Sequence, residues 1–189
     1  MPETGPSRDT AQSRAGVRED DRRRIVCAMN RDTMSRLLRA GLLTGVIDGL
    51  FSSILVVVFY HSTVTRLWQG VASVLLGKEA LDGGTTTALI GLLMHFGVAF
   101  GWSAVFLFLV MRSSWVRDQL ETPNGVIKIA ALYGPFIWIV MSVVVIPLLV
   151  HRPPTFNFRW LVQLIGHIPF VGLPIVWSIA GKRPQTSTT

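Results

Sequence analysis

The sequence predicts an all-α fold: a bundle of four transmembrane helices with one amphipathic helix at the outer membrane interface. Half of the 189 residues are hydrophobic and only 15% are charged, against about 25% in an average soluble domain. Four segments are long and apolar enough to cross a bilayer. The 18 Lys and Arg outnumber the 11 Asp and Glu, and most of them fall on one side of these segments. This composition excludes a disordered chain, a disulfide scaffold and an ordinary soluble enzyme.

The polar residues 1–36 are predicted to form a disordered basic tail, because they bury too little apolar surface to offset the entropy of folding. They do not resemble a signal peptide, in which an apolar run follows a short basic start. The single cysteine, Cys27, cannot form an internal disulfide. No aromatic residues are interleaved with the arginines of the tail. The tail therefore favours a role in membrane orientation or a contact with anionic lipid, and no nucleic-acid partner is predicted.

Crossing the hydrocarbon core takes about 20 mostly apolar residues. Four segments meet this requirement, and they cover residues 40–60, 86–111, 126–150 and 160–180. The last segment is the least apolar, because it contains Gln163, His167 and two prolines. Four such runs lie too close together to be core helices of a soluble protein. The membrane domain is therefore predicted over residues 37–183, followed by a C-terminal tail over residues 184–189.

The distribution of Lys and Arg predicts that both termini lie in the cytoplasm. With the N-terminus inside, the tail, the loop over residues 112–128 and the C-terminus contain 14 of the 18 cationic residues. The two outer loops contain the other four, Arg66, Lys78, Arg152 and Arg159. An excess of Lys and Arg on one side of the spans is typical of the cytoplasmic side.

Residues 64–76, in the first outer loop, have apolar residues at helical spacing and one polar face. These 13 residues are too few to cross the bilayer. We therefore expect an amphipathic helix in the outer interface, with Trp68 at the depth of the head groups. The alternative is a helix that packs over the bundle as a lid. The second outer loop, residues 151–159, is short and stiffened by Pro153 and Pro154.

Two stripes of glycine predict close packing of helices. Gly41, Gly45 and Gly49 recur on one face of the first span, and Gly97 and Gly101 recur on the second. Small residues at this spacing let helix backbones approach, which matters because lipid supplies no hydrophobic drive between helices. We expect the stripes to pack within the bundle, and homodimerisation through the first stripe is the alternative. The expected partners are the lipid bilayer and either further copies of the chain, as a homo-oligomer, or a larger membrane complex.

Four prolines fall inside the predicted spans, at positions 135, 147, 169 and 174. Each proline removes a backbone donor and frees a carbonyl group, which a membrane helix tolerates where neighbours satisfy the backbone again. We expect packing kinks at these positions. A hinge or a broken helix at a ligand site is the alternative.

Ionisable residues within the spans are the strongest functional signal, because charge inside hydrocarbon is costly. Asp48 lies eight residues into the first span and His95 nine residues into the second, which places them at similar depths. His167 lies further out in the fourth span, with Gln163 one turn above it. The plainest interpretation is a buried Asp48–His95 pair that fixes helix register. The alternatives are a mid-membrane site that binds or relays protons and a metal site formed with His167, for which the sequence lacks a fixed ligand spacing.

No motif for catalysis or for a cofactor stands in the sequence. Gly77-Lys78 lacks the upstream glycine and the following Ser or Thr of a phosphate-binding loop. No metalloprotease helix, nucleophile elbow or catalytic triad can be assembled. The sequence favours a non-enzymatic accessory or structural membrane protein that acts through helix packing, with no cofactor and no metal. The alternatives are a small oligomeric transporter or proton-coupled carrier that uses Asp48, His95 and His167, and an enzyme acting on a lipid-soluble substrate.

A spaced pattern over residues 88–180 resembles a known family. Its parts are a histidine that opens an aromatic-rich span (His95 to Phe108), a glycine-containing span that ends in Pro147-Leu148 (from Gly134), a loop with Pro153, Pro154 and Phe156, and Gly166-His167 in the last span. This pattern resembles the YagU-like group of small bacterial inner-membrane proteins of unassigned chemistry. The resemblance implies a multi-pass protein of the bacterial cytoplasmic membrane with His95 and His167 as the residues to test, and it implies no reaction.

Overall fold

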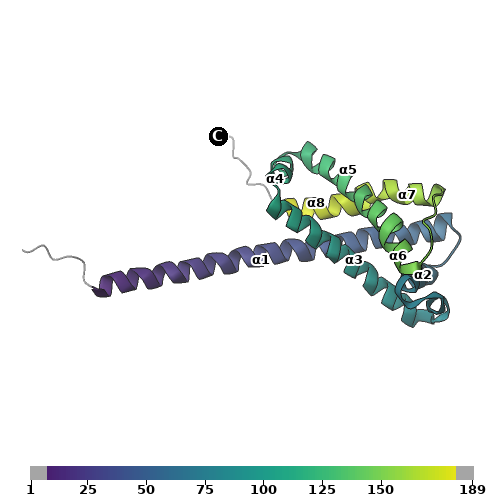
Figure 1. Ribbon diagram of the computed structural model, residues 1–189, viewed down its shortest axis with the longest axis horizontal. Coiled ribbons are helices and arrows are strands. Elements are labelled where there is room, and N and C mark those ends of the chain that lie inside the picture. Colours follow the sequence, from purple (N-terminus) through teal and green to yellow (C-terminus); the bar gives the residue numbers. More distant parts are fainter. Residues whose placement is uncertain (1–7, 182–189) are drawn as a thin grey trace, which may run out of the picture. The chain divides into compact units, whose positions relative to one another are not determined.

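The computed structural model describes residues 8–181, with side chains described from residue 31 onward (Figure 1). Every regular element within this range is helical. The chain divides into two compact units, residues 1–36 and residues 37–189. The predicted C-terminal tail, residues 184–189, lies outside the described residues.

Helix α1 (Arg8–Ile54) begins in the N-terminal unit and continues into the second unit. Residues 8–36 therefore have helical backbone in the structure, where the composition predicts disorder. The sequence offers a physical reason, because residues 8–36 contain no proline and a single glycine, and Arg, Ala, Glu and Gln are good helix formers. Polarity argues against a packed core in this stretch, and it does not by itself argue against a helix.

Four of the described helices are long and apolar enough to cross a membrane, as predicted: Arg31–Phe59, Gly84–Arg112, Pro123–Val150 and Phe158–Ala180. The first ends in a π-helical turn, η1 (Leu55–Phe59), and the second is the unbroken α3 (Gly84–Arg112). The third contains α5 (Pro123–Ile139), the π-helical η3 (Val140–Val145) and α6 (Ile146–Val150). The fourth contains α7 (Phe158–His167), the π-helical η4 (Ile168–Gly172) and α8 (Leu173–Ala180). The connections contain α2 (Val64–Leu76), the 3-10 turn η2 (Lys78–Asp82) and α4 (Ser114–Leu120).

Three of the four prolines lie within or directly beside π-helical turns. Pro147 follows η3, Pro169 lies within η4, and Pro174 follows η4. A wider turn accommodates a residue that cannot donate a hydrogen bond and that clashes with the preceding turn. Pro135 lies inside α5, which remains α-helical around it. The third and fourth spans are therefore irregular helices whose backbone is adjusted at proline.

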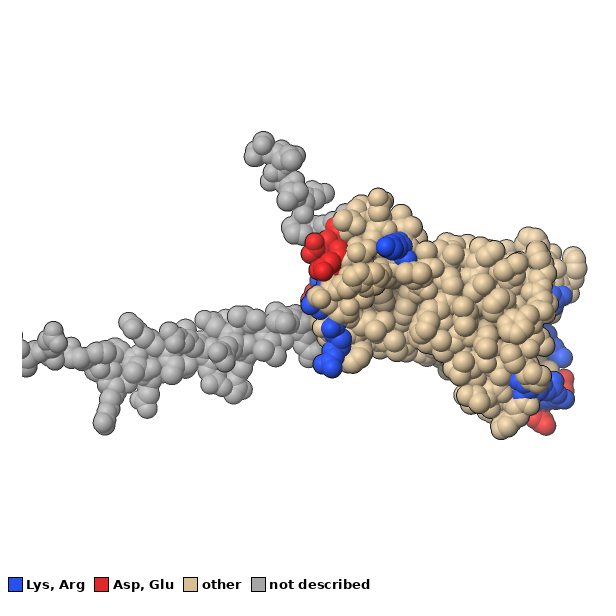
Figure 2. All heavy atoms as spheres, turned by 45° about the horizontal axis from the view of Figure 1, so that its top comes forward, with Lys and Arg blue, Asp and Glu red and all other residues tan. Residues whose placement is uncertain are grey.

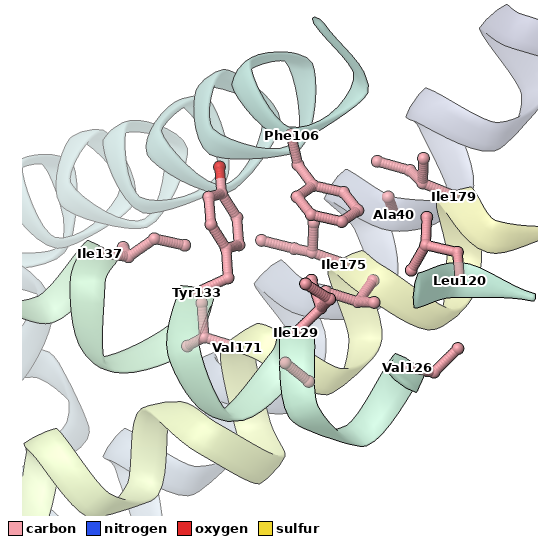
Figure 3. Packing of buried hydrophobic residues seen from close by; sticks show 12 residues of the cluster. Ala40, Phe106, Leu120, Val126, Ile129, Tyr133, Ile137, Val171, Ile175 and Ile179 are labelled. Atoms are coloured by element: carbon pink, nitrogen blue, oxygen red, sulfur yellow. The ribbon is translucent and has the colours of Figure 1, made fainter. Parts of the chain in front are cut away.

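The hydrophobic core lies between α3, α5, η4 and α8, and Ala40 of α1 reaches it (Figure 3). The ring of Phe106 is 1% exposed, and Ile175 is fully buried. The hydroxyl of Tyr133 donates a hydrogen bond of 2.7 Å to the carbonyl oxygen of Trp102, which ties α5 to α3. Figure 1 shows α5 alongside α7 and α8. This core fixes the third and fourth spans against each other.

Outside the core, large apolar side chains are exposed. Leu93 is 72% exposed, Trp177 70% and Leu148 69%. Figure 2 shows the charged side chains gathered toward the two ends of the helical domain, with a broad uncharged band between them. A soluble monomer rarely leaves so large an apolar surface open. The surface is that expected of helices surrounded by lipid.

The predicted helix over residues 64–76 is present as α2, with the expected bounds. The side chain of Thr63 caps its N-terminus by accepting a hydrogen bond of 3.1 Å from the backbone N–H of Arg66. Trp68 is buried, with its ring beside Gly49 and His95 and not directed outward toward head groups. The backbone of α2 lies directly against Gly91 of α3. The helix packs onto the bundle, as in the lid alternative, because its apolar face meets α3.

Candidate functional site

Asp48 of α1 and His95 of α3 lie together inside the helical domain. Nδ1 of His95 lies 4.0 Å from Oδ2 of Asp48, and the two side chains are 15% and 13% exposed. Nε2 of His95 lies 3.0 Å from the carbonyl oxygen of Gly45. The ring of Trp68 covers the imidazole, with 5.1 Å between the ring centroids.

These contacts indicate which ring nitrogen of His95 carries a proton. A carbonyl oxygen only accepts, so Nε2 of His95 carries the proton that is donated to Gly45. Nδ1 then faces Asp48 either as the acceptor of a neutral ring or as the donor of a charged one. Oδ1 of Asp48 is buried and has no hydrogen-bond partner among the residues described. At 4.0 Å the two side chains are close enough for an ion pair and too far apart for a direct hydrogen bond.

The two glycine stripes differ in their surroundings. A Cβ atom at Gly45 would lie 2.5 Å from ring carbons of Phe96, and one at Gly41 would overlap the ring of Phe100. The first stripe therefore lets α1 approach the aromatic face of α3. At Gly97 and Gly101, by contrast, no described atom lies within 4 Å of the position a Cβ would take. The second stripe faces away from the bundle, whereas the sequence predicts packing within it.

His167 makes its direct contacts with other residues than Asp48 and His95, although it lies close enough to His95 to interact with it electrostatically. Its Nδ1 lies 2.7 Å from the carbonyl oxygen of Gln163, one turn earlier in α7. Its ring stacks against Trp138 of α5 at a centroid distance of 4.8 Å, and the residue is 8% exposed. Among the described residues, no group of three His, Cys, Asp or Glu side chains is arranged to hold a metal ion. Asp48, His95 and His167 are therefore not arranged as the ligands of one metal ion.

A pocket of about 490 Å³ opens where α6 ends and α7 begins, at the predicted outer end of the bundle. We call it the α6–α7 pocket, and its lining includes Tyr60, Trp138, Trp160, Gln163, Arg152 and Arg159. The indole N–H of Trp160 donates a hydrogen bond of 2.9 Å to the hydroxyl of Ser142. The guanidinium carbon of Arg159 lies 4.1 Å from the centroid of the Tyr60 ring. Of the four predicted site residues, Gln163 alone lines this pocket.

Three buried polar atoms of pocket residues have no hydrogen-bond partner in the described part of the chain. They are the hydroxyl of Tyr60, the indole N–H of Trp138 and the side-chain oxygen of Gln163. Buried polar groups in folded proteins are nearly always paired, so three in one place mark an incomplete polar environment. The sequence signal that could have pointed to this site was Tyr60 and Trp160, aromatic residues at the ends of two spans, which are also typical of an interfacial belt.

No family model, curated protein or solved structure matches this chain.

Proposed function

We propose that this chain is a multi-pass protein of the bacterial cytoplasmic membrane that acts as a non-enzymatic accessory or structural subunit through helix packing. Both termini lie in the cytoplasm, and α2 lies at the outer interface, packed on α3. The four apolar helices support the membrane assignment. The excess of Lys and Arg in the predicted inner segments supports the orientation. The YagU-like resemblance supports the bacterial membrane.

One observation carries the structural role. Asp48 and His95 face each other and the backbone of Gly45, under the ring of Trp68. Neither residue lines the α6–α7 pocket. A polar pair that joins two membrane helices helps to set their register. The pair is therefore a structural link between α1 and α3.

Partners of the proposed subunit are lipid and other membrane helices. The outward face of α3 is apolar and includes Gly97, Gly101 and the exposed Leu93. This face is available to a second copy or to a partner subunit. The oligomeric state, measured by light scattering on the detergent-solubilised protein, tests this part of the proposal.

A proton-coupled carrier is the second candidate, and it is favoured by one observation. The buried Oδ1 of Asp48 has no hydrogen-bond partner in the region described, and such a carboxylate is a recurrent feature of proton pathways. The distinguishing experiment reconstitutes the protein in vesicles that contain a pH-sensitive dye. The structural role predicts the same proton flux for the unmodified chain, Asp48→Asn and protein-free vesicles. A flux that appears with the unmodified chain and disappears with Asp48→Asn would establish the carrier.

A further inference from the structure

We propose that the α6–α7 pocket binds the head group of an anionic phospholipid that has free hydroxyl groups, of the glycerol phosphate type. The phosphate pairs with Arg152 and Arg159, and the hydroxyl-bearing part contacts the unpaired polar groups beneath. The start of the hydrocarbon tail lies on the apolar wall of the pocket. The Asp48–His95 pair takes no part in this binding.

The charge of the pocket is the first reason. Arg152 and Arg159 both line it. Among the described residues, neither guanidinium has an acidic partner or a hydrogen bond, and that of Arg159 lies over the Tyr60 ring. Arginine matches phosphate well, because its planar guanidinium donates two parallel hydrogen bonds and remains charged. The cation–π contact with Tyr60 positions the guanidinium of Arg159 beside the pocket. Two unneutralised cations at one pocket favour an anion over a zwitterionic or cationic head group.

The direction of α7 adds to this charge. Asn157 caps its N-terminus by accepting a hydrogen bond of 3.0 Å from the backbone N–H of Trp160, and Asn157 also lines the pocket. The positive end of the helix dipole therefore lies at the same place as the two arginines. A phosphate bound there would be stabilised by both.

The unpaired polar atoms are the second reason, and they are independent of the charge. They are buried beneath the pocket surface in the lipid-free protein, so the head group pairs with them when the pocket side chains shift. Tyr60 and Trp138 offer donors, while the side-chain oxygen of Gln163 is an acceptor that needs a donor. The phosphodiester of a phospholipid has no proton to give Gln163 at neutral pH, whereas hydroxyl groups on the head group supply both acceptors and donors. The chemistry of these three groups therefore favours a polyhydroxyl phosphate over a fatty-acid carboxylate.

The remaining wall is apolar. Ile146, Pro147 and Val150 line the pocket from α6, and their neighbour Leu148 is largely exposed on the outer surface of that helix. The volume of about 490 Å³ lies within the range of small-ligand sites, about 300–1,000 Å³. A head group fits inside this volume, and an acyl chain continues along α6 toward the uncharged band of the surface (Figure 2). This arrangement indicates an amphiphile held at the membrane surface.

The test measures lipid binding to the full chain, purified in a non-ionic detergent, by native mass spectrometry and by thermal stabilisation. The probes are phosphatidylglycerol, phosphatidylethanolamine, oleate and glycerol 1-phosphate. We expect phosphatidylglycerol to bind most tightly. The double variant Arg152→Gln/Arg159→Gln should raise the Kd for phosphatidylglycerol at least tenfold. A hydrogen bond to a charged group contributes binding free energy equivalent to about a tenfold change in Kd or more. The matched control is Lys78→Gln, which removes an exposed cation that does not line the pocket and should leave the Kd unchanged.

The variant Tyr60→Phe separates a loss of lipid binding from a loss of folding. It removes one unpaired hydroxyl and no hydrogen bond of the described chain, so it should weaken phosphatidylglycerol binding without lowering the melting temperature of the lipid-free protein. Equal losses in Lys78→Gln and in the double arginine variant would overturn the proposal, because binding would then follow surface charge alone. Tighter binding of oleate or phosphatidylethanolamine would refute the assigned head group. Glycerol 1-phosphate binding as tightly as phosphatidylglycerol would identify a water-soluble phosphate and refute the lipid.

Discussion

The contact between α2 and α3 depends on one glycine, and replacing it with alanine tests the packing of the whole outer connection. A Cβ at Gly91 would overlap the backbone carbonyl of Trp68 and would lie 3.0 Å from the backbone nitrogen of Ala72. These are backbone atoms, so no side-chain rotation relieves the clash. Helix α2 must move away from α3, which also withdraws the Trp68 ring from Gly49 and His95.

The size of the effect follows from a matched substitution on the same helix. At Gly97, no described atom lies within 4 Å of an added Cβ. Gly91→Ala and Gly97→Ala therefore share the gain in helix propensity, up to about 1 kcal/mol, and differ in the steric term. Overpacking a buried site costs about 1–3 kcal/mol. The free energy of unfolding of Gly91→Ala should accordingly lie about 1–3 kcal/mol below that of Gly97→Ala.

Reversible unfolding in mixed detergent micelles, followed by tryptophan fluorescence and circular dichroism, measures this difference. The fluorescence of the native state offers a second readout, because Trp68 should become more exposed in Gly91→Ala alone. If both alanine variants unfold at the same detergent fraction, the close approach of α2 to α3 is refuted. A loss of stability in Gly97→Ala would instead place the second glycine stripe in a packed contact.

Three further predictions concern an interhelical hydrogen bond, the Asp48–His95 pair and the orientation in the membrane. Tyr133→Phe should lower the free energy of unfolding by about 0.5–1.5 kcal/mol, because it removes an interhelical hydrogen bond. Tyr60→Phe removes an unpaired hydroxyl and should leave the free energy of unfolding unchanged. Equal losses in the two variants would contradict a stabilising Tyr133–Trp102 hydrogen bond. A double-mutant cycle with Asp48→Ala and His95→Ala should give a coupling of about 0.6 kcal/mol and at most about 1.7, and a coupling of zero would remove the structural link. Cys27 should react with a membrane-impermeant maleimide in inside-out vesicles and not in intact cells, and labelling of intact cells would reverse the proposed orientation.

The spans could be predicted from the sequence because length and apolarity are properties of each segment alone. The helix over residues 64–76 was predictable for the same reason, from its own period. Which face meets which neighbour is a property of the assembled bundle. Gly97 and Gly101 have the same spacing as the packed Gly41 and Gly45, yet they face away from the bundle. A periodic pattern identifies a face and does not identify what covers it.

Two further close backbone approaches, besides that at Gly91, involve glycines outside either stripe. A Cβ at Gly134 would overlap the carbonyl of His167, and one at Gly172 would overlap the carbonyl of Ala130. The approach occurs where η4 departs from α-helical geometry, and the sequence marks that place by Pro169. Here the irregular turn brings the backbones of η4 and α5 together, which the regular spacing of a glycine stripe does not indicate.

The sequence predicts an Asp48–His95 pair, with a site shared with His167 and Gln163 as the alternative, and the structure brings Asp48 and His95 together. Asp48 and His95 close the interface of α1 with α3, whereas Gln163 belongs to a pocket that the prediction did not contain. His167 stands between these regions: its Nδ1 contacts the carbonyl of Gln163, and its ring stacks on Trp138. Both of those residues line the α6–α7 pocket, so His167 supports the pocket wall and touches no ligand position itself. The free-energy cost of burying a polar side chain is thus offset in two ways. Asp48 and His95 pair between two helices, and His167 hydrogen-bonds to the backbone of its own helix.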